Sequence, residues 1–444
     1  MKVVIYSTNT NFFDPHMIHI NSLPSCAENL SEVIKNNPDL KIIIATQLPA
    51  LFLLDYDSEG NIIKAEGAEY VILKGSTAAE IALEIENLSP DLAIASSFWV
   101  TPFDWLPLQD AEIAKILENK GIKTISHPVK ASLDFFDKKR ARDFFCAMGI
   151  KTAPSVYVHH QLFWSERGKN MIKNNAYKEA VFNEISKLTF PVVIKDTLGL
   201  SSYGMEVSKT FNQTKAFLLS KKASGDRLVE EYLSGLQFGT EIHGTPGHYT
   251  VFPPFMFSTN QYGITSPKQS VKIGPVTDEK FKISELKKLL TEMAEKIRLK
   301  GIAQVDLVFH NSQWYVIEVN PRLSGMSQTI AASSGKPLMQ LLLDNALQKN
   351  NQNPEMKMVF DMKFPILTEK QQKKLFNLPF VLYLQQTFNE EANQHREMGF
   401  CEVIFGGRNS REELKEDLEE IKNRFPEILE PVFYENALKI LEWL

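Results

Sequence analysis

Cysteine is scarce in this chain of 444 residues, and its three cysteines lie far apart. Cys26, Cys146 and Cys401 are odd in number and have none of the close spacings that zinc sites and disulfide frameworks use. We therefore expect neither kind of cross-link. A reducing compartment, the cytoplasm, fits this composition.

Long apolar runs are missing as well. No window approaches the ~20 consecutive apolar residues that a membrane helix needs. The N-terminal MKVVIYSTNT reads as a strand and lacks the basic region, apolar stretch and cleavage site of a secretory signal. Positive charge is not in excess either, because 49 Lys and Arg and 54 Asp and Glu give a formal net charge of -5. We expect no membrane segment and no nucleic-acid partner.

Several common motifs are also absent. The first strand is followed by STNTNFF instead of a glycine-rich fingerprint, which argues against a dinucleotide-binding domain. The later glycine loop, GLSSYGM, is not a Walker A loop, because it contains no G-x-x-x-x-G-K-[ST] motif. No G-x-S-x-G elbow occurs, so a serine hydrolase is disfavoured.

The sequence does contain a succession of α/β segments, too long for one core. Residues 1–128 alternate short apolar strand-like runs with helix-like runs, as parallel βαβ units do. Residues 129–354 form a second unit. After the polar linker QKNNQNPE, residues 355–444 read as a small α+β appendage.

Helices are predicted at several points in these units. One apolar stripe predicts a single helix over residues 133–148, which Gly149 ends. A second amphipathic helix is expected in SELKKLLTEMAEKIRL. A third begins at a capping box formed by Ser410 and Glu413. The first of these stripes consists of Leu133, Phe136, Ala141, Phe144, Phe145 and Met148.

The most informative stretch is QVDLVFHNSQWYVIEVNPR, which predicts a hairpin turning near Asn311. A three-residue loop over 311–313 would pair His310 with Trp314, Val308 with Val316, Asp306 with Glu318 and Gln304 with Asn320. Two facing carboxylates repel each other unless a cation lies between them.

Oxygen ligands from Asp306, Glu318 and Asn320 suit a hard ion such as Mg²⁺. Arg322, just past the strand, is suited to stabilising oxyanion or phosphoryl charge. The alternative is a solvated face with ordinary surface charges, and a longer loop would separate the pair.

Lys195 ends the apolar strand PVVIK and precedes the loop GLSSYGM. Backbone N–H groups, hydroxyls and an ammonium in this arrangement are typical of a phosphate site. Glycine/serine hairpin loops are common, however, and a purely structural loop is the alternative.

Four motifs occur in a fixed order: FFDKKRARDFFCAMGIKTAP, FPVVIKDTLGLSSYGM, EEYLSG and the hairpin ending in EVNPR. This succession resembles the ATP-grasp superfamily of carboxylate–amine ligases over about residues 130–340, including L-amino acid, dipeptide and D-alanine–D-alanine ligases. The resemblance implies an α/β and α+β multidomain fold. Residues 1–128 would be the N-terminal βαβ pre-ATP-grasp domain, and residues 129–354 a two-lobed core, with a small lobe over about 150–233 and a catalytic lobe over about 234–354.

The resemblance also implies roles for individual residues on the phosphate side. Lys138 and Lys195 resemble the two lysines that hold the nucleotide phosphates. The loop over 199–205 resembles the lid that closes over the phosphates. Its nucleotide-facing residues would be Gly199, Ser201, Ser202 and Gly204.

On the adenine side, Glu230 would meet the adenine amino group, and the backbone of Tyr232 and Leu233 would complete the adenine edge. Gln237 stands where many members have a glutamate that binds the ribose. An amide can still accept a hydrogen bond from a ribose hydroxyl, although without the help of charge.

On the catalytic side, Asp306, Glu318 and Asn320 resemble the magnesium ligands, for which Mn²⁺ is a substitute. Arg322 resembles the arginine that contacts the acyl phosphate. Lys268 and Lys272, in GITSPKQSVKIGP, would lie near the acceptor pocket and could bind the γ-phosphate or a substrate carboxylate. Solvated loop lysines are the alternative.

The implied reaction uses ATP to convert a carboxylate into an acyl phosphate, which an amine then attacks. The expected partners are small-molecule carboxylates and amines, with amino acids or small peptides favoured by analogy. Whether the chain forms a homodimer is left open. The alternatives are a bicarbonate-using enzyme of the carboxylase type and a nucleotide-binding scaffold without catalysis.

Overall fold

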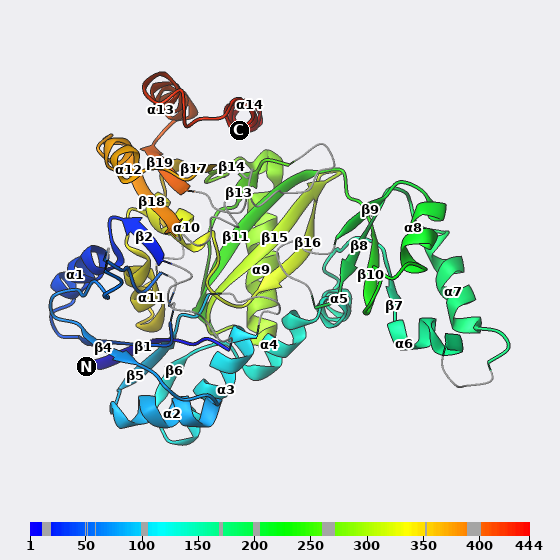
Figure 1. Ribbon diagram of the computed structural model, residues 1–444, viewed down its shortest axis with the longest axis horizontal. Helices are drawn as coiled ribbons and strands as arrows, with labels where there is room; N and C mark the ends of the chain where they lie inside the picture. Colours follow the sequence, from blue (N-terminus) through cyan, green and yellow to red (C-terminus); the bar gives the residue numbers. More distant parts are fainter. Residues whose placement is uncertain are drawn as a thin grey trace.

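The structure is a computed structural model (Figure 1). It describes residues 1–10, 19–48, 50, 52–57, 59–98, 105–167, 172–198, 205–259, 271–350, 353–388 and 401–444. Within these residues the strands form three sheets, of five, four and ten strands. None of the helices in this part of the chain has the length and apolar character needed to cross a membrane.

The first sheet is entirely parallel and has the order β4-β3-β1-β5-β6. Its three inner strands are apolar and largely buried, because helices cover both faces. The sheet therefore confirms the predicted N-terminal βαβ arrangement. Its strands are β1 (Lys2–Ser7), β3 (Lys41–Thr46), β4 (Glu69–Ile72), β5 (Leu92–Ala95) and β6 (Lys123–Ile125), and its helices are α1 (Cys26–Asn36), α2 (Ala78–Asn87) and α3 (Leu106–Asn119).

Two helices, α4 (Val129–Phe136) and α5 (Lys138–Ala147), follow this sheet. The prediction of one continuous helix here was wrong. Asp137 has extended backbone angles, and its side chain accepts hydrogen bonds from the backbone N–H groups of Lys139 and Arg140. It thus caps a new helix, as aspartate does at the N-cap position.

The second sheet is small and antiparallel, with the order β7-β10-β8-β9. It lies with its helices at one end of the elongated molecule (Figure 1). The predicted pair of strands around the glycine loop is confirmed as β8 and β9. The elements are β7 (Ser155–Val158), β8 (Val192–Asp196), β9 (Glu206–Ser208), β10 (Arg227–Glu231), α6 (His160–Phe163), α7 (Ala176–Ile185) and α8 (Phe211–Leu218).

The third sheet is large and antiparallel, and three parts of the chain build it. Its order is β16-β15-β11-β13-β14-β17-β19-β18-β2, with β12 paired to β11. The middle of the chain supplies β11 (Leu236–Thr245), β12 (His248–Val251), β13 (Phe255–Phe257), β14 (Val271–Gly274), β15 (Gly301–His310) and β16 (Gln313–Asn320). The C-terminal part supplies β17 (Met358–Phe364), β18 (Val381–Phe388) and β19 (Cys401–Arg408), and the N-terminal part supplies β2 (His19–Leu23).

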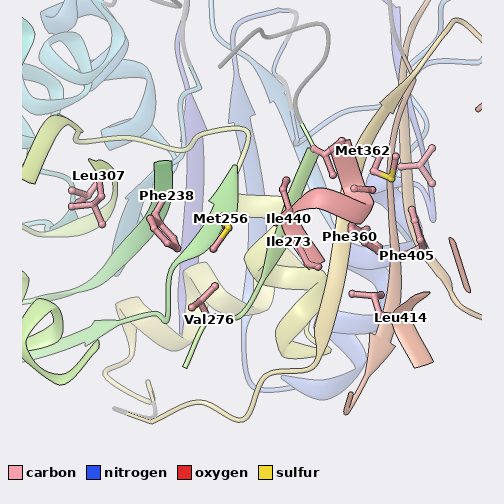
Figure 2. Packing of buried hydrophobic residues seen from close by; sticks show 14 of the residues in the cluster. Phe238, Met256, Ile273, Val276, Leu307, Phe360, Met362, Phe405, Leu414 and Ile440 are labelled. Atoms are coloured by element: carbon pink, nitrogen blue, oxygen red, sulfur yellow. The ribbon is translucent and has the colours of Figure 1, made fainter. Parts of the chain in front are cut away.

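One hydrophobic core runs along this sheet into the C-terminal part. Figure 2 shows Phe238 and Met256 in the same packed layer as Phe360, Leu414 and Ile440. The residues after 355 therefore extend the large sheet and pack on it. The remaining helices are α9 (Ile283–Ile297), α10 (Ser327–Ser334), α11 (Leu338–Ala346), α12 (Glu369–Phe376), α13 (Arg411–Arg424) and α14 (Pro431–Leu441). The predicted capping box at Ser410 and Glu413 is confirmed at the start of α13.

Candidate active site

The hairpin of β15 and β16 turns one residue more tightly than predicted. Asn311 and Ser312 both have positive φ, 48° and 56°, and His310 pairs with Gln313. This is the geometry of a two-residue hairpin turn, in which both central residues are left-handed. The predicted three-residue loop, with His310 opposite Trp314 and Val308 opposite Val316, was therefore wrong.

A β-bulge nevertheless restores the predicted register further along. Leu307 pairs with Val316, but Asp306 pairs with Glu318, so Ile317 is the extra residue. A bulge inserts one residue into one strand, which offsets the residue by which the turn is shorter. The predicted pairings of Asp306 with Glu318 and of Gln304 with Asn320 are confirmed.

The bulge is also a docking point for the preceding helix. The Ile317 carbonyl accepts a hydrogen bond of 2.7 Å from Nη1 of Arg142, on α5. The Val316 N–H donates to the carbonyl of Lys151 at 2.9 Å. These contacts fix the hairpin against the segment that leads into the small sheet.

The two facing carboxylates lie in unequal surroundings. Nζ of Lys138 is 2.8 Å from Oε1 of Glu318. Burial would raise the pKa of Glu318, but the charges of Lys138, Lys195 and Arg322 outweigh it and hold that pKa below its usual range. For Asp306, burial and then the Glu318 charge raise the pKa to about 7.

A chain of amides connects Asp306 to Arg322. Nε2 of Gln304 donates to Oδ1 of Asp306 at 2.5 Å, and Nδ2 of Asn320 donates to Oε1 of Gln304 at 2.9 Å. Nη2 of Arg322 donates to Oδ1 of Asn320 at 3.3 Å. Arg322 is thus held on the same face of the hairpin as the carboxylates.

The donor set on this face fits a divalent cation. Asp306, Glu318 and Asn320 offer only oxygen atoms as ligands, and hard ions such as Mg²⁺ prefer oxygen. Across the residues that the structure describes, no group of three or more His, Cys, Asp or Glu residues has the arrangement of a metal site. Mg²⁺ sites of one or two carboxylates commonly obtain their remaining ligands from phosphate and water.

Behind the hairpin, Glu230 of β10 lies buried between two cations. Its Oε1 accepts from Nε of Arg142 at 2.6 Å, and its Oε2 accepts from Nζ of Lys195 at 2.5 Å. Burial would raise the pKa of Glu230, but the charges of Lys195 and Arg142 outweigh burial and lower it to about 2. Lys195 and Glu230 are close because Lys195 pairs with Leu228, two residues before Glu230.

Arg142 is a site residue that the sequence interpretation missed. It lies four residues after Lys138 on α5, so both side chains share one face of the helix. That spacing was a signal that could have identified it. Arg142 links three elements, since it contacts Glu230 on β10 and Ile317 on β16 from α5.

Replacing Arg142 with methionine should lower the free energy of unfolding by about 3–5 kcal/mol, because Glu230 would then be buried with only Lys195 as counter-ion. Urea denaturation measures this difference. Arg140→Met on the same helix is the control. Arg140 is half-exposed and its partner Asp134 keeps a second cation, Lys130, so this change should cost at most about 1 kcal/mol. Equal stability of the two variants would contradict the role given to Arg142.

The connection between the small and the large sheet carries the remaining adenine-side residues. The Tyr232 N–H donates to the Pro191 carbonyl at 3.0 Å, and the Leu233 carbonyl accepts from the Gly235 N–H at 3.0 Å. Gln237 follows on β11, paired with Phe257 and Val308. Gln237 therefore borders the hairpin, and the roles of all three residues toward a nucleotide stay predictions.

Several predicted residues lie elsewhere. Gly199, Ser201, Ser202, Gly204 and Lys268 lie outside the residues that the structure describes. Lys272 is on β14, with Nζ 2.5 Å from Oδ2 of Asp361 and 3.1 Å from the Gly325 carbonyl. It is engaged within the large sheet, apart from the contacts of Lys138 and Lys195.

A second missed residue, Glu241 on β11, anchors the loop that carries Arg322. Its Oε1 accepts hydrogen bonds from Oγ of Ser324 at 3.0 Å and Oγ of Ser327 at 2.6 Å. Gly239, two residues earlier, lets the loop approach, because a Cβ there would lie 2.5 Å from Sδ of Met326. The loop therefore crosses β11 closely, which no local sequence pattern indicated.

Comparisons with known proteins agree with this architecture. Residues 169–326 match a family described as an ATP-grasp domain. The arginine-specific large chain of carbamoyl phosphate synthase from Geobacillus stearothermophilus is 23% identical over 316 residues, which is 67% of this chain and 28% of that protein. This chain thus spans less than a third of that relative's length.

Two solved structures share the fold along nearly the whole chain. The L-amino acid ligase from Bacillus licheniformis has a TM-score of 0.65 and 17% identity, covering 95% of this chain and 97% of that one. The biotin carboxylase domain of the Hydrogenobacter thermophilus 2-oxoglutarate carboxylase, solved with MgADP, ADP and bicarbonate, has a TM-score of 0.60 and 12% identity, covering 96% and 90%. Residues 169–326 are thus similar to an ATP-grasp domain, and the chain shares the three-sheet fold of these solved structures.

Proposed function

We propose that this chain is an ATP-dependent ligase that activates a carboxylate as an acyl phosphate and joins it to an amine, with amino acids or small peptides as substrates. The observation that carries the proposal is the face of the β15–β16 hairpin. There, Asp306 and Glu318 face each other, Lys138 contacts Glu318, and Arg322 is linked to Asp306 through the amides of Asn320 and Gln304.

The proposed reaction has two steps. An oxygen of the substrate carboxylate attacks the γ-phosphorus of ATP, and the bond between that phosphorus and ADP breaks. The amine nitrogen then attacks the acyl carbon and loses a proton, and phosphate leaves with one oxygen from the carboxylate. Positioning and charge neutralisation supply most of the catalysis in such phosphoryl transfers.

Different residues of the chain would bind the nucleotide and stabilise the charge that develops in the reaction. Lys138 and Lys195 bind the phosphates, and Glu230, with the backbone of Tyr232 and Leu233, borders the adenine. Arg322 stabilises the negative charge that develops on the acyl group, because its guanidinium presents paired donors to oxygen atoms. The hydrogen-bonded amides between Asp306 and Arg322 hold that guanidinium near the carboxylates.

Asp306, Glu318 and Asn320 would hold Mg²⁺, for which Mn²⁺ could substitute. When bound, the cation neutralises charge on the transferring phosphoryl group. Glu318 would then exchange its contact with Lys138, now 2.8 Å away, for the cation. This exchange would leave Lys138 able to turn toward phosphate.

The test is ADP release with ATP and Mg²⁺ in the presence of single and paired amino acids, with mass spectrometry of the products. We expect ADP release that depends on particular amino acids and a product whose mass equals that of the condensed pair. ADP release that needs only bicarbonate and an acceptor would favour the carboxylase type. Tight ATP binding without turnover on a broad carboxylate and amine panel would favour a scaffold.

Replacing Lys195 with alanine should weaken ATP binding by about tenfold or more, because a charge-assisted contact to phosphate is lost. Calorimetric titration with a non-hydrolysable ATP analogue measures this affinity. Lys187→Ala is the control, since Lys187 forms an exposed ion pair with Glu184 near the end of α7. Unchanged nucleotide affinity in Lys195→Ala would remove Lys195 from the phosphate site.

A further inference from the structure

A second charged cluster lies in the large sheet, outside the hairpin. Lys272 on β14 pairs with Asp361 on β17, and Lys363 on β17 pairs with Glu402 on β19. Since side chains alternate along a strand, Asp361 and Lys363 share one face of the sheet. The alternate residues of β17, such as Phe360 and Met362, lie in the hydrophobic core with Leu414 and Ile440 (Figure 2).

Within the cluster, every N–H of the Lys272 ammonium has an acceptor, whereas one oxygen of Asp361 has no donor among the residues described. The three N–H groups of the Lys272 ammonium have three acceptors: Asp361 at 2.5 Å, the Gly325 carbonyl at 3.1 Å and Glu402 at 3.4 Å. Oδ2 of Asp361 also accepts from Oγ1 of Thr329 at 2.5 Å. Oδ1 of Asp361 is buried and has no hydrogen-bond partner among the residues described.

A buried hydrogen-bond acceptor without a donor destabilises the folded state, so Oδ1 of Asp361 is expected to receive one. Asp361 is only 1% exposed, so water does not satisfy its free oxygen from outside. Glu402 lies beside it, and burial together with the Asp361 charge raises the pKa of Glu402. Buried ion clusters are seldom needed for stability, because apolar residues of similar volume often serve equally well. A cationic N–H group is the strongest hydrogen-bond donor to a carboxylate oxygen.

The loop that carries Arg322 leads directly to this cluster. Gly325, whose carbonyl accepts from Lys272, is three residues after Arg322. Three residues span at most about 11 Å, so the cluster lies no farther from Arg322 than an extended short peptide can reach. Thr329, in the first turn of α10, continues the same path to Asp361. The loop thus connects Arg322 to the cluster through Gly325.

We propose that Asp361, assisted by Glu402, binds the protonated amino group of the substrate whose carboxyl group reacts beside Arg322. Oδ1 of Asp361 accepts an N–H of that ammonium, and Lys272 and Thr329 hold the carboxylate in place. The substrate class is therefore amino acids or short peptides with a free amino group. This assignment rests on the proposed ligase function, in which the carboxyl group of the substrate reacts. It adds a site that selects the amino group of the same substrate.

The test is a binding measurement, independent of turnover. Thermal unfolding is followed with saturating MgADP and increasing concentrations of single amino acids or dipeptides, each compared with the acid of the same skeleton that lacks the amino group. Alanine and propionate, and phenylalanine and 3-phenylpropionate, are such pairs. We expect at least one amino acid or dipeptide to stabilise the wild type at concentrations where its partner acid does not.

Asp361→Asn should weaken that binding by about 10- to 100-fold, because the amide keeps the volume but loses the charge that attracts the ammonium. Asp417→Asn is the matched control. Asp417 is another buried aspartate, bound through both oxygens by Arg408, so its loss should lower stability without changing the affinity for amino acids. If Asp361→Asn does not fold, Glu402→Gln at the edge of the cluster should show the same weakening.

The proposal is overturned if no amino acid or dipeptide stabilises the wild type in preference to its partner acid, or if the variants at Asp361 and Glu402 bind as tightly as wild type. Preferential binding that Asp361→Asn abolishes, without any ADP release or product from wild type, would support the ammonium site and contradict the ligase function. The ligase function and the ammonium site at Asp361 can therefore be contradicted independently of each other.

Discussion

Replacing Glu318 with glutamine should reduce ADP formation by about 10²- to 10³-fold while the fold stays intact. The substitution keeps the volume of the side chain but removes one of the two carboxylate charges that would hold the divalent cation. It also removes the repulsion between Glu318 and Asp306, which limits any loss of stability. Steady-state rates at increasing Mg²⁺ concentrations measure the effect, and urea denaturation checks the fold.

Glu184→Gln is the control for this variant, because Glu184 is an exposed residue of α7 with Lys187 as its only charged neighbour in hydrogen-bond contact among the residues described. It should have wild-type kinetics. A Glu318→Gln enzyme that kept near-normal turnover at low Mg²⁺ would show that the facing carboxylates do not form the metal site. The proposed function would then lose its main support.

Replacing Arg322 with lysine should lower kcat by about 10²-fold and leave the KM for ATP nearly unchanged. Lysine keeps the positive charge, but it lacks the planar pair of donors that matches an acyl phosphate or a tetrahedral oxyanion. It also breaks the hydrogen bonds by which the guanidinium contacts Asn320 and the Leu323 carbonyl. Rates at saturating and limiting ATP separate the two parameters.

Arg424→Lys is the matched control, since Arg424 forms an exposed pair with Glu420 on α13. If Arg322→Lys raised the KM for ATP and spared kcat, Arg322 would belong to the nucleotide site. If both parameters stayed normal, Arg322 would have no part in the reaction.

The hairpin illustrates how far the sequence could predict this site. Alternation along 304–320 placed Asp306 and Glu318 on one face, because a half-buried strand has a period of two. Their predicted pairing is met because the bulge at Ile317 offsets the tighter turn. The turn was mispredicted, since Asn311-Ser312 lacks the glycine that usually marks a two-residue turn. No residue type around Ile317 indicated the bulge, whose carbonyl is satisfied by Arg142 from a distant helix.

Residues whose importance comes from long-range contacts were harder to predict. Glu241 looks like a surface residue of a strand, but it is buried, and serines of the loop that crosses β11 donate hydrogen bonds to it. Asp361 and Glu402 lie in the segment expected to be an appendage. They face Lys272 because β17 and β19 extend the large sheet. Such a juxtaposition depends on strand order across the sheet, which local patterns do not encode.

The activation of a carboxylate by ATP is the central claim, and oxygen transfer tests it most directly. Amino acids labelled with ¹⁸O in the carboxylate are incubated with the enzyme, ATP and Mg²⁺, and the released phosphate is analysed by mass spectrometry. We predict one ¹⁸O atom in the phosphate for each product molecule, because the acyl phosphate loses a former carboxylate oxygen with its phosphate. Product formation with unlabelled phosphate would contradict the account.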